Sequence, residues 1–222
     1  MARFFRPTVL EVFNLSNTEL GDIFAVYGII AMLSYFPGGA IADRFPAKKL
    51  IALSLWTTAL GGLYFAKIPD QNGLIMLFAY WGCTSILLFW AALIRATREW
   101  GGSFSQGRAF GFVDGGRGLI AAGAASLIVI IFTIALPANS ELASEIQLKH
   151  ALQLVIYAYT AITFLAGFIV WWFIPNDHNN HNANQRHSIT DMKYVLGKPA
   201  IWLQAIIVIC AYCAYKGLDN YA

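Results

Sequence analysis

Six long apolar runs, separated by short charged segments, constrain the fold of this chain more than any other feature. They cover approximately residues 20–42, 50–66, 74–94, 109–136, 151–174 and 199–218. A helix needs about 20 apolar residues to cross a bilayer, so runs of these lengths are candidates for membrane spans. The chain is 58% hydrophobic and 12% charged, and a soluble domain carries about twice that charged fraction. The sequence therefore predicts an all-α, polytopic membrane protein, a bundle of about six helices.

The composition also excludes several classes of protein. A net charge of +3 is too small and too dispersed for a nucleic-acid-binding protein. The three cysteines, Cys83, Cys210 and Cys213, all lie in apolar runs. An odd count in that context predicts no disulfide framework. The Cys210-x-x-Cys213 pair is interpreted as helix packing, with a redox or metal pair as the alternative.

The cations of the connecting segments are distributed unevenly between the two sides of the predicted bundle. One side carries nine of them: Arg44, Lys48, Lys49, Arg95, Arg98, Arg108, Arg186, Lys193 and Lys198. The other side carries five: Arg3, Arg6, Lys67, Lys149 and Lys216. Because cytoplasmic loops are richer in lysine and arginine, the first side is predicted to face the cytoplasm.

Residues 39–49, here called the signature loop, connect the first two apolar runs on that side. The segment contains Gly39, then Asp43-Arg44, and then the basic pair Lys48-Lys49. This pattern resembles the loop between the second and third helices of the major facilitator superfamily of transporters. Pro46-Ala47 stand where that family has a second glycine. The alternative is an ordinary basic cytoplasmic loop.

The resemblance implies a domain organisation. Aligned on the signature loop, the six runs correspond to family helices 2 to 7. Residues 1–175 would then be a partial N-terminal six-helix bundle without its first helix, 176–198 the cytoplasmic linker, and 199–222 the first helix of a truncated C-terminal bundle. We therefore expect the chain to be an internal piece, or the product of a broken reading frame, of a twelve-helix transporter, inactive in transport by itself.

Two ionisable residues, Asp114 and Arg117, lie inside the fourth apolar run. They are three residues apart and so share one helical face. The resemblance implies that this helix lines the central cavity, where a cation would favour an anionic substrate. The alternative is a pair that only neutralises itself, or one that partners the signature loop. The other substrate-binding candidates are Trp90, Tyr212 and Tyr215, for which lipid or interfacial contact is the alternative.

The signature loop supplies the candidate gating residues: Gly39, Asp43, Arg44, Lys48 and Lys49. By resemblance, Asp43 pairs with cations or caps a neighbouring helix and so closes the inner gate in one state of the transport cycle. A stripe of small residues in the fourth run predicts close packing, most readily against run 50–66. Its members are Gly111, Gly115, Gly118, Ala122 and Gly123.

The sequence predicts no catalytic residues, no cofactor and no metal site. An intramembrane protease would need a histidine within a span, and none lies there. His178, His181 and His187 lie in a polar tract that contains no cysteine. The predicted function is secondary active transport of a small hydrophilic solute, coupled to protons or sodium, in the bacterial inner membrane. The overall resemblance is closest to uptake carriers for sugar acids and related organic anions. The alternative is a non-transporting membrane scaffold.

Overall fold

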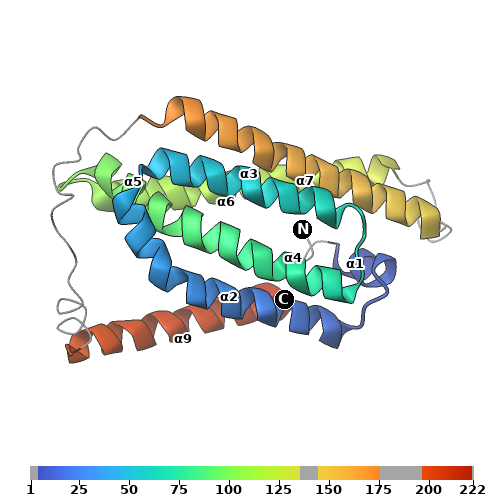
Figure 1. Cartoon of the computed structure of the whole chain (residues 1–222), viewed down its shortest axis with the longest axis horizontal. Helices are drawn as coiled ribbons and strands as arrows, with labels where there is room; N and C mark the ends of the chain where they lie inside the picture. The colour runs from blue at the N-terminus through green and yellow to red at the C-terminus, as the bar shows by residue number, and fades with distance from the viewer. Residues whose placement is uncertain (1–4, 136–144, 176–196, 222) are drawn as a thin grey trace. The chain divides into compact units, whose positions relative to one another are not determined.

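The computed structural model describes residues 5–135, 145–175 and 197–221, and all their regular elements are helices. The helices fall into two units, Met1–His178 and Asn179–Ala222, each described by itself. The first unit contains α1 (Arg6–Val12), α2 (Asn17–Arg44), α3 (Ala47–Phe65), α4 (Gln71–Cys83), the π-helix η1 (Thr84–Trp90), α5 (Ala91–Gly101), α6 (Gln106–Ala135) and α7 (Glu145–Phe173). The second contains α9 (Pro199–Tyr221). The expected all-α fold is confirmed (Figure 1).

Helix α2 begins three residues before the apolar run 20–42 and ends at a tighter turn than expected. The Ser16 Oγ accepts a hydrogen bond from the Glu19 amide at 3.2 Å, and the Glu19 carboxylate accepts one from the Ser16 amide at 2.7 Å. This capping box satisfies two amides that would otherwise lack partners. At the other end, Phe45 and Pro46 alone separate α2 from α3. Lys48 and Lys49 therefore lie in the first turn of α3, although the sequence predicted them in the turn itself.

The third long helix is continuous through α4, η1 and α5, from Gln71 to Gly101. Asp70 caps its start, with Oδ1 accepting from the Gly73 amide at 3.1 Å. The sequence predicts a charged connecting segment between the runs 74–94 and 109–136, and this is wrong for residues 96–101, which are helical. An ion pair between Arg95 and Glu99, one helical turn apart, supports the extra turns. The helix ends where Gly102 adopts a φ of +56°, which glycine tolerates without steric cost.

By length and composition, four helical stretches of the described chain can cross a membrane. They are Asn17–Tyr35, Gln71–Gly101, Gln106–Ile134 and Glu145–Phe173. Helix α3 has 19 residues but includes Lys48 and Lys49, which lower its hydropathy. Helix α9 contributes a shorter apolar stretch, Pro199–Ala211.

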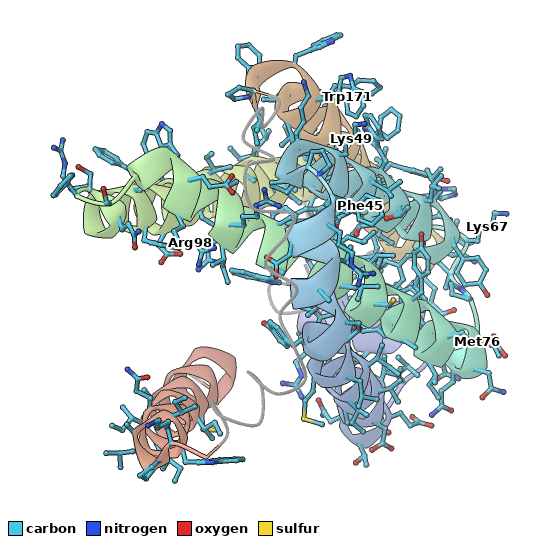
Figure 2. The ribbon with its side chains drawn as sticks, turned by 60° about the vertical axis from the view of Figure 1, so that its left-hand side comes forward. Phe45, Lys49, Lys67, Met76, Arg98 and Trp171 are labelled. Atoms are coloured by element: carbon cyan, nitrogen blue, oxygen red, sulfur yellow. The ribbon has the colours of Figure 1, made fainter. Side chains whose placement is uncertain are left out.

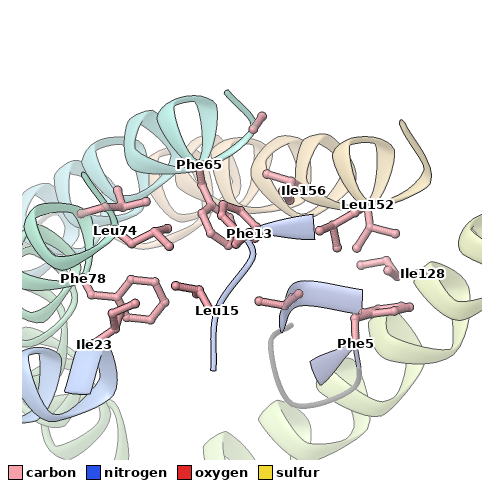
Figure 3. Packing of buried hydrophobic residues seen from close by; sticks show 14 residues of the cluster. Phe5, Phe13, Leu15, Ile23, Phe65, Leu74, Phe78, Ile128, Leu152 and Ile156 are labelled. Atoms are coloured by element: carbon pink, nitrogen blue, oxygen red, sulfur yellow. The ribbon is translucent and has the colours of Figure 1, made fainter. Parts of the chain in front are cut away.

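The main core of the first unit lies where α1 meets the ends of the long helices (Figure 3). Phe13 stacks on Phe65 with 5.0 Å between ring centroids, and Phe5 contacts Phe132 at 4.7 Å. The N-terminal residues, too polar to cross a membrane, therefore contribute apolar side chains to the core. The buried members of this cluster are Phe5, Val9, Phe13, Leu15, Ile23, Phe65, Ala66, Leu74, Leu77, Phe78, Ile128, Leu152, Val155 and Ile156.

The small residues of α6 do not pack as expected. Helix α6 packs against α5 and α7, and a Cβ added at Gly111, Gly115 or Gly118 would meet no atom within 4 Å. Close approach occurs instead between α3 and α7, where a Cβ at Gly62 would overlap the Thr160 hydroxyl. The predicted packing of this stripe against run 50–66 is therefore wrong.

We expect Gly62→Val to lower the free energy of unfolding by about 1–3 kcal/mol, because the added methyl groups force α3 away from α7. Chemical denaturation in detergent measures this change. Gly28→Val is the matched control, since a Cβ at Gly28 meets nothing within 4 Å. Equal losses in the two variants would contradict close packing at Gly62.

Candidate functional site

Three of the predicted substrate-binding residues lie together between η1 and α6. The Arg117 Nη2 is 3.1 Å from the Asp114 Oδ1, one turn back along α6. On its other side, the Arg117 guanidinium carbon lies 5.2 Å from the centroid of the Trp90 ring. A guanidinium over an indole face at that separation is a cation–π contact. Trp90 is the last residue of η1, so the cluster joins two helices.

This cluster remains accessible in the described unit. The side chains of Arg117 and Asp114 are 55% and 65% exposed. Arg117 follows Arg108 by nine residues, which is about 13 Å along a helix, so it lies well inside the span. The arrangement offers a fixed cation, a hydrogen-bond acceptor and an aromatic face to a ligand that approaches α6.

The other two predicted binding residues, Tyr212 and Tyr215, lie on α9 in the second unit. Their side chains, like residues 176–196 of the predicted linker with His178, His181 and His187, lie outside the described residues. Their roles stay predictions.

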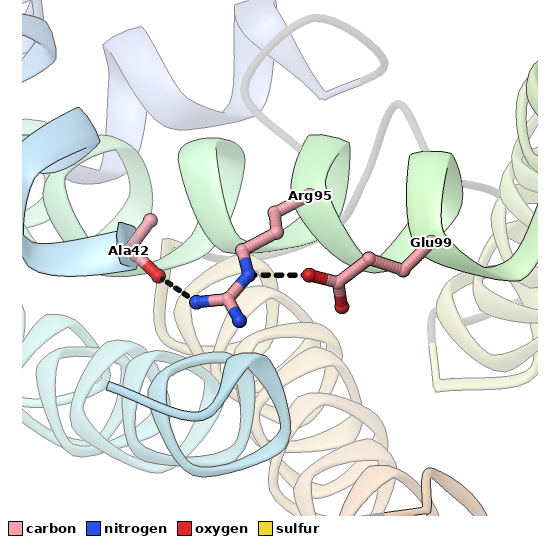
Figure 4. Close-up of polar contacts among 3 residues, drawn as sticks. All are labelled: Ala42, Arg95 and Glu99. Atoms are coloured by element: carbon pink, nitrogen blue, oxygen red, sulfur yellow. Dashed lines mark hydrogen bonds and ion pairs between the residues drawn. The ribbon is translucent and has the colours of Figure 1, made fainter. Parts of the chain in front are cut away.

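The end of the first unit that carries the signature loop is held by Arg95. Its Nη1 donates to the Ala42 carbonyl at 2.6 Å and its Nε to the Glu99 Oε1 at 2.6 Å (Figure 4). Ala42 lies in the last turn of α2, where carbonyls lack partners within the helix. A cation there also interacts favourably with the helix dipole. Arg95 thus fixes α5 against the helix end from which the loop starts.

The predicted gating residues lie at the same end. Asp43, Arg44 and Lys49 are exposed, whereas Lys48 Nζ lies 5.4 Å from the centroid of the Trp171 ring on α7. Figure 2 labels Phe45, Lys49 and Trp171 on neighbouring parts of this end. A Cβ at Gly39 would meet nothing within 4 Å, and its gating role stays a prediction.

Two residues with clear contacts were not predicted as functional. Arg95 was counted only as a loop cation, although its spacing from Glu99 indicates an ion pair on a continuing helix. Gly38 approaches the backbone of η1 so closely that a Cβ added there would lie 3.1 Å from the Leu87 carbonyl oxygen. The Pro37-Gly38-Gly39 sequence marks a weak point in α2 but does not reveal what it contacts.

The described part of the chain contains no group of three or more histidine, cysteine, aspartate or glutamate residues that could hold a metal ion. Cys83, Cys210 and Cys213 form no disulfide.

Comparison with known proteins identifies relatives over nearly the whole chain. The chain is 28% identical over 219 residues to "Inner membrane protein YqcE" of Escherichia coli, covering 97% of this chain and 49% of the relative. It is also 28% identical to "Inner membrane protein YihN" of Escherichia coli, with 94% and 48% covered. Over 74 residues it is 32% identical to the "Probable galactarate/D-glucarate transporter GudP" of Pseudomonas putida, covering 32% of this chain and 16% of that protein.

The chain thus spans about half the length of the first two of these relatives. No solved structure matches it. The apolar helices and the inner-membrane relatives together support a multi-pass location in the inner membrane. The family model described as Major Facilitator Superfamily matches residues 1–222, and the chain therefore belongs to this superfamily of membrane transporters.

Proposed function

We propose that this chain forms part of a secondary active transporter that moves a small organic anion or sugar derivative by alternating access. The observation that carries the proposal is the position of the Arg117 guanidinium between Asp114 and the Trp90 ring. A cation inside a membrane span costs a few kcal/mol on insertion scales and is favoured only beside protein or a watery cavity. Placing the Arg117 charge in the span thus costs free energy, and binding an anion would offset that cost.

The chemistry of the cluster fits a sugar acid. A guanidinium can bind a carboxylate with two parallel hydrogen bonds. The indole face can pack against the C–H groups of a sugar chain, and the Asp114 carboxylate can accept hydrogen bonds from hydroxyl groups. The name of the Pseudomonas putida relative, a probable galactarate/D-glucarate transporter, agrees with this class of solute.

The rest of the proposal concerns organisation and energy. Residues 1–175 would contribute most of one bundle, 176–198 the cytoplasmic linker, and 199–222 the first helix of the second bundle. A proton or sodium gradient would supply the energy, as in a symporter. The chain would move its solute without making or breaking a covalent bond, and so would not be an enzyme.

The test uses a chimera in which residues 1–222 replace the aligned segment of YqcE. Uptake of radiolabelled D-glucarate and of D-glucose, a neutral control, is measured in membrane vesicles under an imposed proton or sodium gradient. We expect saturable accumulation of D-glucarate under one of the gradients and none of D-glucose. A chimera that inserts in the membrane but accumulates no organic anion would contradict the proposal and favour a membrane scaffold.

A further inference from the structure

Two irregular stretches of helix backbone face each other in the first unit. Pro37 lies inside α2, and its ring nitrogen cannot donate the hydrogen bond that an α-helix needs at that position. In the third long helix, η1 replaces the α-helical pattern over Thr84–Trp90. Gly38 joins them, since a Cβ there would lie 3.1 Å from the Leu87 oxygen and 3.7 Å from the Ile86 oxygen. Helices bend at prolines and at π-helical segments, so both helices are weakened where they touch.

The part of the third long helix that precedes its contact with Gly38 is held firmly by α3. The Ser54 hydroxyl donates to the Thr84 carbonyl at 2.7 Å, and the Thr58 hydroxyl donates to the Thr84 hydroxyl at 3.1 Å. One turn earlier, the Trp81 Nε1 donates to the Thr58 carbonyl at 3.0 Å. Ser54 is 1% exposed, and a buried hydroxyl with a partner fixes its helix strongly. Helix α4 and the start of η1 therefore belong to the rigid part of the bundle.

The parts of α2 and of the third long helix that follow the contact at Gly38 are held to each other. We call residues 38–44 of α2 together with α5 the tip. Within the tip, Arg95 donates to the Ala42 carbonyl at 2.6 Å. The tip meets α3 through a small apolar cluster that includes Ala42, Ala47 and Ala92. Apolar contacts are non-directional, so this contact allows the tip to tilt on α3 about the two-residue turn at Phe45 and Pro46.

Trp90 connects the tip to the proposed binding cluster. It is the last residue of η1, immediately before α5, and its ring faces Arg117 on α6. A turn of the tip that moves Trp90 relative to α6 would therefore change the distance between the indole and the guanidinium. The signature loop begins inside the tip, so the same movement displaces Asp43 and Arg44.

We propose that Pro37–Gly38 and the part of η1 from Ile86 to Trp90 form one paired hinge, which couples ligand occupancy at Trp90 and Arg117 to movement of the tip and the signature loop. The hinge itself follows from the backbone contacts, and the ligand coupling rests on the proposed function. Gly38, Ser54 and Thr84 then act as positioning residues. The hinge implies two positions of the tip. A ligand shifts the equilibrium between them only if it binds one position more tightly than the other, and displacement of the indole from Arg117 supplies that difference in affinity.

The experiment measures distances between spin labels in a cysteine-less version of the YqcE chimera, reconstituted in nanodiscs. One label pair, Met76→Cys and Arg98→Cys, spans η1. Both parent residues are exposed, and Figure 2 labels both. A second pair, Ala40→Cys and Arg98→Cys, lies within the tip. We expect two populations of label–label distance for the spanning pair, and D-glucarate should favour one of them. The pair within the tip should show a single narrow distance population.

Variants of the hinge give the decisive comparison. Pro37→Ala restores the missing donor of α2, and Gly38→Ala presses a methyl group against η1. We expect each to reduce the spanning pair to one population while the pair within the tip stays unchanged. Gly28→Ala is the matched control in the same helix, because a Cβ there meets nothing within 4 Å. A spanning pair that behaves identically in wild type and both hinge variants would overturn the proposal, as would equal broadening within the tip.

Failure of the hinge and failure of the proposed function give different results. If Pro37→Ala abolishes the second population but D-glucarate alters nothing in wild type, the hinge is supported and the proposed solute is wrong. If D-glucarate is accumulated normally by Pro37→Ala vesicles, the hinge is overturned and the transport proposal remains.

Discussion

The Arg117→Gln chimera should lose nearly all D-glucarate uptake while still inserting in the membrane. Glutamine keeps much of the length of the side chain but removes the charge and the forked donors. Hydrogen bonds to a charged group contribute about 1.5–3 kcal/mol, which corresponds to roughly a 10- to 100-fold loss of affinity. Initial uptake rates across a range of D-glucarate concentrations measure the effect.

The variant must be separated from a purely structural loss, because Arg117 also pairs with Asp114 at 3.1 Å. Removing Arg117 alone leaves the Asp114 carboxylate without that partner. The double variant Arg117→Gln/Asp114→Asn removes both charges, so it should recover thermal stability without recovering uptake. Recovery of uptake in the double variant would mean that the two residues only neutralise each other. Arg108→Gln, an exposed cation earlier in α6, should behave as wild type.

Much of the fold follows from local sequence signals. The Ser16–Glu19 capping box and the Asp70 cap start their helices with residue types that favour helix starts, because capping depends on residues within one turn. The extension of the third helix to Gly101 was missed because the polar residues Thr97, Arg98 and Glu99 interrupt the apolar run. An ion pair along the helix offsets that polarity, and hydropathy alone does not register it.

The contacts of the candidate site also fall into those that the sequence predicts and those that depend on tertiary packing. Asp114 and Arg117 share a face because of helical spacing alone, so their pairing could be inferred from the sequence. The contact between Arg117 and Trp90 depends on how η1 and α6 pack, and 27 positions separate these residues in the chain. The π-helix itself has no apparent sequence signal. Its Thr84 carbonyl is held by Ser54 of another helix, so tertiary contact determines it.

The small residues of α6 illustrate a different limit. A stripe of glycine and alanine predicts close packing but not the partner. In the described unit, the positions of Gly111, Gly115 and Gly118 meet no neighbour, whereas the glycines that do make close contacts lie in α2, α3, α4, α5 and α7. Spacing within one helix therefore indicates a surface suited to contact, and the rest of the bundle decides whether the contact forms.

Arg95→Gln should cause the second large effect, a loss of both stability and uptake. The Arg95 side chain is 18% exposed and donates from two different nitrogens, to the Ala42 carbonyl and to Glu99. Glutamine cannot reach both acceptors and carries no charge. Since one charged hydrogen bond contributes about 1.5–3 kcal/mol, the free energy of unfolding should fall by at least that order. Chemical denaturation in detergent and the vesicle uptake assay measure the two losses.

Substitution by lysine tests whether geometry or charge is responsible. Lysine keeps the charge but replaces the planar fork with a single ammonium group, so Arg95→Lys should recover part of the stability and little of the uptake. Arg98→Gln, an exposed cation on the same helix, is the matched control and should change neither. If Arg95→Gln proved as mild as Arg98→Gln, α5 would not hold the end of α2. Some other contact would then have to fix the signature loop against α5, because the two-residue turn at Phe45 and Pro46 connects α2 to α3 and not to α5.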